Sequence, residues 1–591
     1  MASYPSKDRS RITITRTPSD KTAQATGLVE VKRVPAGVPR ETRGRRRRVS
    51  KPPRKPKPSA GRWVALTEVL LILLFAFLSS VGIIHHELWR DETQSWLLAR
   101  DSLSVAELFR NTHYEGHPLL WHYCLYGISR VSRSPFAMQM FNWLLAVGSV
   151  VLIVKKSPFS LLERALLIFG YFTFYEYALL SRSYGLGIFL AFLFCAVYCG
   201  RSVISRWRAW LMAVVLTLLA NTSILGLVMS GVLAIAFYYR ISLSPDVRLR
   251  KAISSYAFLL IVGWGVSAFQ IGRSLFNPLG IEGFDADARA AVARGETALA
   301  VVRQTVESTL SADALEKVDK LLQIVLKSHL PLPSFHFHFW NDHLLSAQSL
   351  IHSSAGLVLL GISALLVGLL LFVSFQLLRK TPLFLSVYVL GCLSMTAIFV
   401  GAYRGATRHY GYLFILLIVC LWLAKWSRQN LGLSAPSSFA TKLFTGILCV
   451  QVLAGVYAYT SDLFYPFSAS YQTAQVIETQ LDSLPVLAIH QRPISPISGY
   501  LDQPLYYPEA KRFGSFWDIS YPEMTDEGAI AQAIRAFSVT HSDFVAVLSL
   551  PLDNEGGDVG RGLDVEYLAY IGPSIVEDEA FFLYRVQRSA T

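Results

Sequence analysis

Residues 85–118 form the polar stretch of the chain whose side chains are best suited to chemistry. It contains Arg90, Asp91 and Glu92, and His117 lies near its end. A carboxylate can take the proton of an attacking hydroxyl as a general base. Asp91 is therefore the first candidate for a catalytic base and Glu92 the second. Neighbouring residues on a helix point about 100° apart, so we expect only one of them to face a substrate. The alternative is that both simply mark the end of a helix.

This stretch directly follows a long apolar run, residues 63–84, whose only charged residue is Glu68. A helix of that length reaches roughly 33 Å, which is enough to cross a bilayer. The chain as a whole is 52% hydrophobic and 16% charged, with a mean hydropathy of +0.39. This composition predicts an α-helical polytopic membrane protein.

Ten further apolar runs predict a total of about eleven transmembrane helices. A shorter run, residues 118–129, is too brief to cross and predicts a helix at the membrane surface. With this assignment every inner loop is basic, as cytoplasmic loops are. The predicted spans after the first are residues 136–154, 159–180, 184–200, 207–220, 223–240, 252–276, 351–378, 382–402, 409–426 and 439–460.

The basic charge of the chain is concentrated before the first span. Residues 1–62 hold 18 Lys/Arg and four Asp/Glu, an excess equal to the net charge of the whole chain, +14. Residues 1–61 are predicted to be a disordered basic cytoplasmic tail that contacts anionic headgroups. A nucleic-acid-binding arm is the alternative, but a basic tail before a membrane helix more often sets topology, so we expect no nucleic-acid partner.

The remaining segments are predicted to lie outside the cytoplasm. They include a first outer loop, residues 85–135, a long outer loop, residues 277–350, and a C-terminal region, residues 461–591. The last of these alternates short apolar stretches with helical patterns, which predicts a small α/β domain. It carries 18 acidic and seven basic residues. Six aromatic residues between positions 500 and 517 either stack on sugar rings or form the core of this domain.

Four cationic or imidazole side chains fall at the predicted outer ends of helices, against the usual inside bias. Arginine binds phosphate through its planar fork of donors. The four are therefore candidates for holding a phosphate, although snorkelling to headgroups is the alternative. They are Arg182, Arg404, Arg408 and His409.

The sequence indicates no cofactor and no metal, and leaves dependence on a divalent ion open. Residues 335–343 (FHFHFWNDH) contain three histidines and an aspartate, but an aromatic patch at the membrane interface fits them better than a metal site. All six cysteines lie in apolar segments. No Walker or glycine-rich phosphate motif indicates ATP or a nucleotide sugar.

The motifs WRDETQSWLLARDS (residues 89–102) and EGHPLLWHYCLY (residues 115–126) resemble the first outer loop of the GT-C glycosyltransferases. The similarity is to the branch of protein O-mannosyltransferases and aminoarabinose transferases. Two weaker similarities are SRSYGLGIFLAFL (residues 181–193) and RHYGYLF (residues 408–414). The resemblance covers roughly residues 62–460, which would be a GT-C-like catalytic domain.

The resemblance implies an enzyme that transfers a hexosyl or pentosyl group from a polyprenyl phosphate, with inversion. The acceptor would be a glycan, a glycolipid or a protein at the outer face of a bacterial inner or plasma membrane, as in cell-envelope glycan synthesis. Arg90, His117 and Glu176 are then candidates for orienting the acceptor. The alternatives are a transporter or flippase of lipid-linked glycans, and a polysaccharide polymerase or ligase.

Overall fold

The computed structural model describes most of the chain beyond the N-terminal tail. The described residues are 58–200, 204–275, 314–401, 403, 405–481, 484–521, 523–552 and 562–589. The predicted tail up to residue 57 and the first part of the predicted long outer loop therefore lie outside the described residues. Contacts divide the chain into residues 1–60 and one compact unit of residues 61–591.

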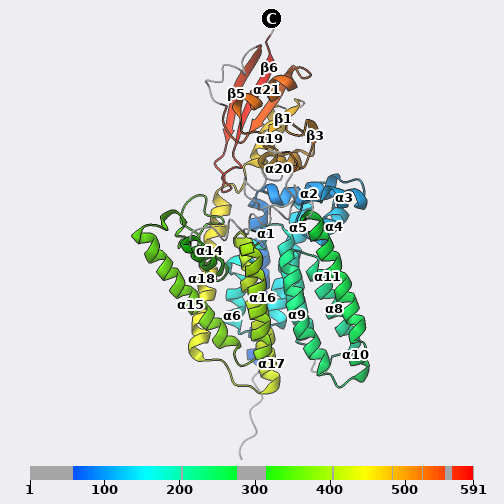
Figure 1. Cartoon of the computed structure of the whole chain (residues 1–591), viewed down its shortest axis with the longest axis vertical. Helices are drawn as coiled ribbons and strands as arrows, with labels where there is room; N and C mark the ends of the chain where they lie inside the picture. The colour runs from blue at the N-terminus through cyan, green and yellow to red at the C-terminus, as the bar shows by residue number, and fades with distance from the viewer. Residues whose placement is uncertain are drawn as a thin grey trace, which may run out of the picture. The chain divides into compact units, whose positions relative to one another are not determined.

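Eight described helices are long and apolar enough to cross a membrane. Figure 1 shows the long helices side by side below the strands. The predicted polytopic helical fold is therefore confirmed. α17 is the central helix, because 83% of its most apolar window is buried against 11–56% for the other seven. The eight are α1 (Pro58–His85), α5 (Phe136–Lys156), α9 (Ile224–Ser242), α11 (Ile253–Leu275), α15 (Ser354–Leu378), α16 (Pro382–Gly401), α17 (Thr407–Leu431) and α18 (Ser438–Phe464).

Three of the eleven predicted spans are not among these eight helices, so the count of eleven is not confirmed. The predicted span 159–180 is divided near Gly170 into α6 (Leu161–Ile168) and a π-helix (Tyr171–Glu176). The other two are α7 (Ser183–Tyr198) and α8 (Arg206–Ala220). Sixteen residues of α-helix reach only about 24 Å, which is less than the apolar thickness of a bilayer.

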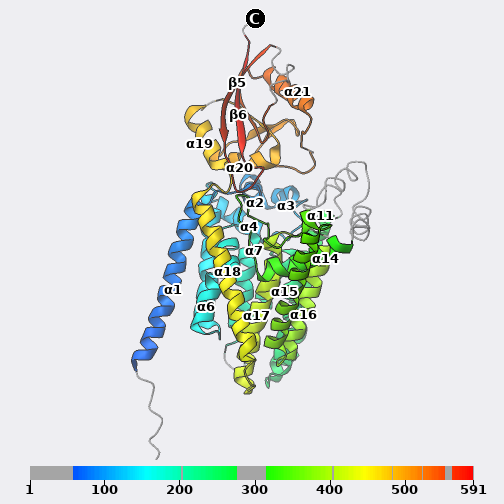
Figure 2. The same cartoon turned by 90° about the vertical axis from the view of Figure 1, so that its left-hand side faces the viewer.

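Shorter helices follow α1 and lie, in Figure 2, between the long helices and the C-terminal strands. α4 is ten residues long, which agrees with the short helix predicted over residues 118–129. These helices are α2 (Arg90–Asp101), α3 (Val105–Asn111) and α4 (Leu120–Ser129). Elsewhere the chain forms α10 (Val247–Lys251), α14 (Ala314–His329) and a 3-10 turn (Gln348–Leu350).

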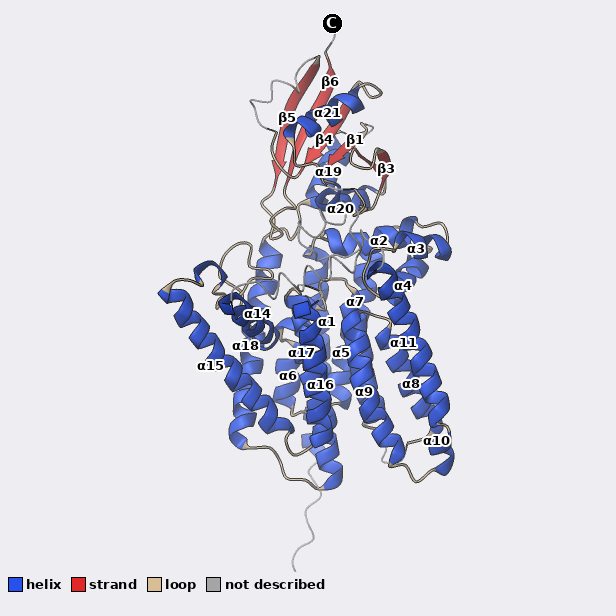
Figure 3. Cartoon of the chain, in the orientation of Figure 1, coloured by secondary structure: helices blue, strands red, loops and turns tan. Residues whose placement is uncertain are grey.

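The C-terminal region contains a six-stranded mixed sheet with helices, as predicted (Figure 3). The strand order is β3-β2-β1-β4-β6-β5, with β1 parallel to both neighbours and the remaining pairs antiparallel. The strands are β1 (Val486–Ile489), β2 (Leu505–Tyr507), β3 (Arg512–Gly514), β4 (Asp543–Leu548), β5 (Leu563–Ile571) and β6 (Phe581–Arg588). The helices are α19 (Ser470–Gln480), α20 (Gln491–Leu501) and α21 (Glu527–Ser538).

The C-terminal region packs directly on α2, the helix that begins with the candidate catalytic carboxylates. Gln94 donates from its amide nitrogen to the carbonyl oxygen of Trp517 at 2.9 Å, and the Trp517 N–H donates back to Oε1 of Gln94 at 3.3 Å. The backbone N–H of Leu88 donates to the hydroxyl of Tyr500 at 2.7 Å. This region therefore contributes to positioning α2, although it is far away in sequence.

Candidate active site

Glu92 is fully buried, and hydrogen bonds hold both of its carboxylate oxygens. Oε1 accepts from the backbone N–H of Ser181, and Oε2 lies 3.1 Å from Nε2 of His86. Nδ1 of His86 lies 2.8 Å from Oδ2 of Asp462 at the end of α18. Burial alone would lower the pKa of His86, but the carboxylates of Asp462 and Glu92 raise it well above its usual value. Glu92 therefore pairs with a buried cation that joins α1, α2 and α18.

Asp91 points to a different set of partners, as expected for adjacent helical positions. Its Oδ2 accepts from Nη2 of Arg408 at 3.0 Å, and its backbone carbonyl accepts from Nη1 of Arg182. Burial would raise the pKa of Asp91, but the charges of Arg182 and Arg408 hold it below its usual value. Its Oδ1 has no hydrogen-bond partner among the residues that the structure describes. Asp91 is thus a buried, ionised carboxylate with one unoccupied oxygen.

The guanidinium of Arg408 is enclosed by two tryptophan rings as well as by Asp91. Its Cζ lies 5.0 Å from the ring centre of Trp89 and 5.4 Å from that of Trp340. The two rings meet edge to face, with centroids 4.7 Å apart. The backbone carbonyl of Arg408 also accepts from the hydroxyl of Tyr177 at 2.6 Å. Stacking on aromatic faces leaves the edge of the guanidinium able to donate to an anion.

His409 has different partners from Arg408. Nδ1 of His409 accepts from the backbone N–H of Ala406 at 2.8 Å, which caps the start of α17. Its Nε2 lies 3.0 Å from the hydroxyl of Tyr403. Both ring nitrogens are therefore engaged within the protein. Arg404 lies outside the described residues.

His117 lies close enough to Arg182 for the arginine charge to act on its ring. Its Nε2 is 3.4 Å from the hydroxyl of Tyr184, and its Nδ1 has no hydrogen-bond partner among the described residues. Burial and the positive charge of Arg182 lower the pKa of His117 to about 4. His117 is therefore a neutral imidazole. One of its nitrogens can accept a hydrogen bond from a substrate or donate one to it, depending on the tautomer.

Arg90 and Glu176 each have ion-pair or hydrogen-bond partners other than Asp91. Nη1 of Arg90 is 2.5 Å from Oδ2 of Asp578, and its backbone N–H donates to Oε1 of Glu579 at 3.0 Å. Oε2 of Glu176 accepts from the hydroxyl of Tyr171 at 2.7 Å. Arg90 therefore connects α2 with the loop before β6. Glu176 is held within the π-helix, a distortion that is frequent at functional sites.

Two further residues belong to this site, although no motif in the sequence indicates them. Trp340 stacks on Arg408, but it lies in a histidine-rich segment that indicated only an interfacial patch. Arg492, in the first turn of α20, lies over the ring of Trp517 at 5.1 Å and adds to the positive charge that acts on Asp91. Arg492 follows Asp91 by about four hundred residues, and no local pattern signals that the two approach each other.

The described residues contain no cluster of three His, Cys, Asp or Glu side chains that could hold a metal ion. The histidines of residues 335–343 have different hydrogen-bond partners. Nε2 of His336 pairs with Oδ2 of Asp342 at 2.8 Å, whereas Nδ1 of His338 is 3.2 Å from the carbonyl of Ile575. Phe335 and Phe339 of the same segment both pack on Tyr457 of α18. The segment is thus an aromatic support for the site.

Comparisons with known proteins found similar structures but no similar sequences. No family model and no curated protein matches the chain. ArnT from Cupriavidus metallidurans in the apo state is 11% identical, with a TM-score of 0.47 over 89% of this chain and 98% of that chain. The same protein bound to undecaprenyl phosphate is 12% identical, with a TM-score of 0.43 over the same shares.

A second kind of protein is also similar. The oligosaccharyltransferase AglB from Archaeoglobus fulgidus, in complex with an inhibitory peptide and a dolichol phosphate, is 11% identical with a TM-score of 0.39. The match covers 83% of this chain and 70% of that chain. ArnT is an aminoarabinose transferase, and both proteins are GT-C glycosyltransferases, the class that the sequence motifs resemble.

Proposed function

We propose that this protein is a membrane glycosyltransferase that transfers a hexosyl or pentosyl group from a polyprenyl phosphate to a hydroxyl acceptor. The observation that supports this most directly is the surroundings of Asp91. A buried carboxylate with one unoccupied oxygen stands beside arginines that can bind a phosphate. Transfer of a sugar from a glycosyl phosphate needs both a base for the incoming hydroxyl and cations for the leaving phosphate.

The reaction is a direct displacement that inverts the anomeric carbon. The acceptor oxygen forms a bond to that carbon, while the bond from the carbon to the phosphate oxygen breaks. Asp91 takes the proton of the hydroxyl, and the phosphate leaves with the electron pair of the broken bond. Arg408 and Arg182 stabilise the charge on the leaving phosphate.

Because Arg408 contacts Asp91, the strength of Asp91 as a base depends on whether the donor phosphate is bound to Arg408. In the unliganded protein these arginines hold the pKa of Asp91 below its usual value, which makes the carboxylate a weak base. A phosphate bound to Arg408 neutralises part of that charge and competes for its donors. The pKa of Asp91 then rises, so the carboxylate becomes a stronger base when the donor is in place.

The proposed acceptor class is a glycan, a glycolipid or a protein at the outer face of the membrane. His117 supports an orienting role, because its neutral ring has one nitrogen without a partner among the described residues. Arg90 and Glu176 support the site through the contacts described above. Glu92 remains a proposed alternative base, but its hydrogen bonds to Ser181 and His86 favour a positioning role.

The test is a transfer assay with the purified full-length protein in lipid nanodiscs and a panel of polyprenyl-phosphate hexoses and pentoses. We expect Asp91→Asn to lower transfer by about 10² to 10⁴, the usual contribution of a positioned base, while donor binding is retained. The control is Asp564→Asn, an exposed aspartate on β5. Transfer from no donor in the panel would contradict the proposed function, and full activity of Asp91→Asn would contradict the role of Asp91.

A further inference from the structure

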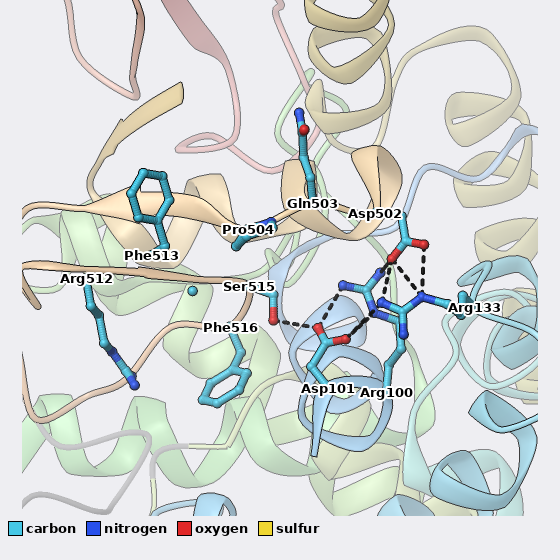
Figure 4. A pocket seen from close by; sticks show the side chains of 11 residues that line it. Arg100, Asp101, Arg133, Asp502, Gln503, Pro504, Arg512, Phe513, Ser515 and Phe516 are labelled. Carbon is cyan, nitrogen blue, oxygen red and sulfur yellow. Dashed lines mark hydrogen bonds and ion pairs between the residues drawn. The ribbon is translucent and has the colours of Figure 1, made fainter. Parts of the chain in front are cut away.

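A cavity lies at the end of α2 opposite to Asp91, where this helix meets the C-terminal region. It has a volume of about 320 Å³ and is lined by the end of α2, by Arg133 before α5 and by the hairpin of β2 and β3 (Figure 4). Of the six aromatic residues predicted to stack on sugars or to form a core, Tyr507 and Trp517 are buried in the structure. Phe513 and Phe516 instead line this cavity.

One wall of the cavity is a network of two arginines and two aspartates. Arg100 pairs with Asp101 at 2.7 Å and with Asp502 at 3.1 Å, and Arg133 pairs with Asp502 at 2.8 Å and with Asp101 at 3.3 Å. Oδ2 of Asp101 also accepts from the hydroxyl of Ser515 at 2.6 Å. The four charges cancel, and each side chain fixes the others. The wall therefore presents oriented donors and acceptors with no net charge.

The opposite wall carries two aromatic rings and Arg512, whose charge is balanced by Asp518 at 3.6 Å. The side chain of Phe513 is 48% exposed, although its ring is held by Tyr506 of the paired strand at 5.2 Å between centroids. Phe516 is half-buried beside it. Aromatic rings that line a cavity beside a fixed polar network favour a ligand with an apolar face and several hydroxyl groups. Sugar rings have both features, because their C–H groups lie on one face and their hydroxyls at the edge.

We propose that this cavity binds neutral sugar units of the acceptor glycan, at a distance from the hydroxyl that reacts. The inference rests on the proposed function for its connection with catalysis. Asp91 and Asp101 stand in the first and last turns of the same helix, and ten residues of α-helix span roughly 15 Å. A glycan of several sugar units that occupies the cavity is therefore long enough to cover the distance to Asp91. The cavity selects an oligosaccharide acceptor over a single sugar.

Binding is tested without any donor, so that the cavity is examined separately from catalysis. The probes are the neutral tetrasaccharides of mannose, glucose and arabinose, with tetragalacturonate as the anionic comparison. Saturation-transfer NMR of the full-length protein in nanodiscs measures the affinity. We expect a neutral tetrasaccharide to bind, and Phe513→Ala to weaken that binding about tenfold or more. Tyr567→Ala, which removes an exposed ring on β5, is the matched control.

A second variant tests the cavity independently, in case the loss of Phe513 disturbs the fold. Gln503 lines the cavity with an exposed side chain outside the ion-pair network, so Gln503→Trp fills the space while leaving the network intact. Absence of binding by every neutral probe, stronger binding of tetragalacturonate, or unchanged affinity in both cavity variants would overturn the proposal.

The transfer assay then separates this proposal from the proposed function. We expect Phe513→Ala to raise the KM for a tetrasaccharide acceptor about tenfold, with kcat and donor affinity unchanged. Transfer to a single-sugar acceptor should not change. A loss of donor binding in this variant would count against the cavity as an acceptor site. Failure of all transfer in the wild type would refute the proposed function, while oligosaccharide binding would still stand.

Discussion

Asp91 and Glu92 are neighbours in sequence, yet they have different physical roles in the structure. Glu92 has a buried cation and a backbone N–H as fixed partners, whereas Asp91 faces arginines and has one oxygen without a hydrogen-bond partner among the described residues. The sequence predicted that only one of the two would face a substrate, since helical neighbours diverge by about 100°. The geometry supports Asp91 for chemistry and Glu92 for positioning.

Replacing Glu92 with glutamine should affect stability far more than replacing Asp91 with asparagine. Glu92→Gln leaves the charged His86 with one carboxylate partner in a buried site, and breaking such a pair typically costs about 3–5 kcal/mol. We expect a lower thermal unfolding midpoint in detergent than for Asp91→Asn. Glu478→Gln, an exposed change on α19, should leave the midpoint unchanged. A fully stable Glu92→Gln that lacks transfer activity would instead make Glu92 the base.

Arg408 should determine donor affinity through the shape of its guanidinium and not only through its charge. We expect Arg408→Ala to weaken binding of the lipid phosphate roughly tenfold to hundredfold, because charged hydrogen bonds contribute about 1.5–3 kcal/mol. Arg408→Lys should restore only part of this affinity, since an ammonium supplies charge but no planar fork of donors. Titration of the protein in nanodiscs with the donor lipid measures this affinity. The control is Arg379→Ala, which changes an exposed arginine. Unchanged affinity in the alanine variant would exclude the role.

At the scale of elements, the site depends on α2 being held from two sides. The π-helix segment and α7 approach from the bundle, while α20 and the loop before β6 approach from the C-terminal region. Removing residues 467–591 would expose a face of α2, so such a deletion would disturb donor and acceptor sites together. Point variants at the junction give a cleaner measurement.

Glu579 makes this junction sensitive to pH. Burial raises its pKa to about 8, although Arg90 acts in the opposite direction. A carboxyl whose pKa is higher in the folded than in the unfolded protein loses its stabilising contribution as pH rises from about 4.5 to about 8. We therefore expect Glu579→Gln to raise the unfolding midpoint by several degrees at pH 8.5 and to change it little at pH 5. Equal effects at both pH values would contradict this assignment.

At the scale of the whole molecule, hydrophobicity predicted most of the fold. Long apolar runs became long helices, and the short run at residues 118–129 became α4. In residues 461–591 the short apolar stretches became strands, among them β1, β4 and β6. Local pattern carries this information, because burial in lipid or in a sheet imposes a periodicity on the sequence.

The remaining features of the fold and of the site depend on tertiary contacts, which the local sequence pattern does not encode. The break between α6 and the π-helix lies inside a continuous apolar run, so composition alone gave one span. Arg492 and Trp340 reach the site through tertiary packing across large separations in sequence. The outer-loop motif identified Asp91 because its chemistry is local, whereas its arginine partners come from three other elements.

The orientation of the chain in the membrane is the last prediction, with the N-terminus inside and the C-terminal region outside. The basic residues of α10, between α9 and α11, favour the cytoplasmic side. Single cysteines are introduced at Leu243, exposed at the end of α9, and at Val539, exposed after α21. The background carries Cys449→Ala, which removes an exposed native thiol. A membrane-impermeant maleimide on intact cells should label Val539→Cys, and Leu243→Cys only after permeabilisation. Labelling of Leu243→Cys in intact cells would reverse the topology and place Asp91 on the cytoplasmic side, where an outer-face acceptor could not reach it.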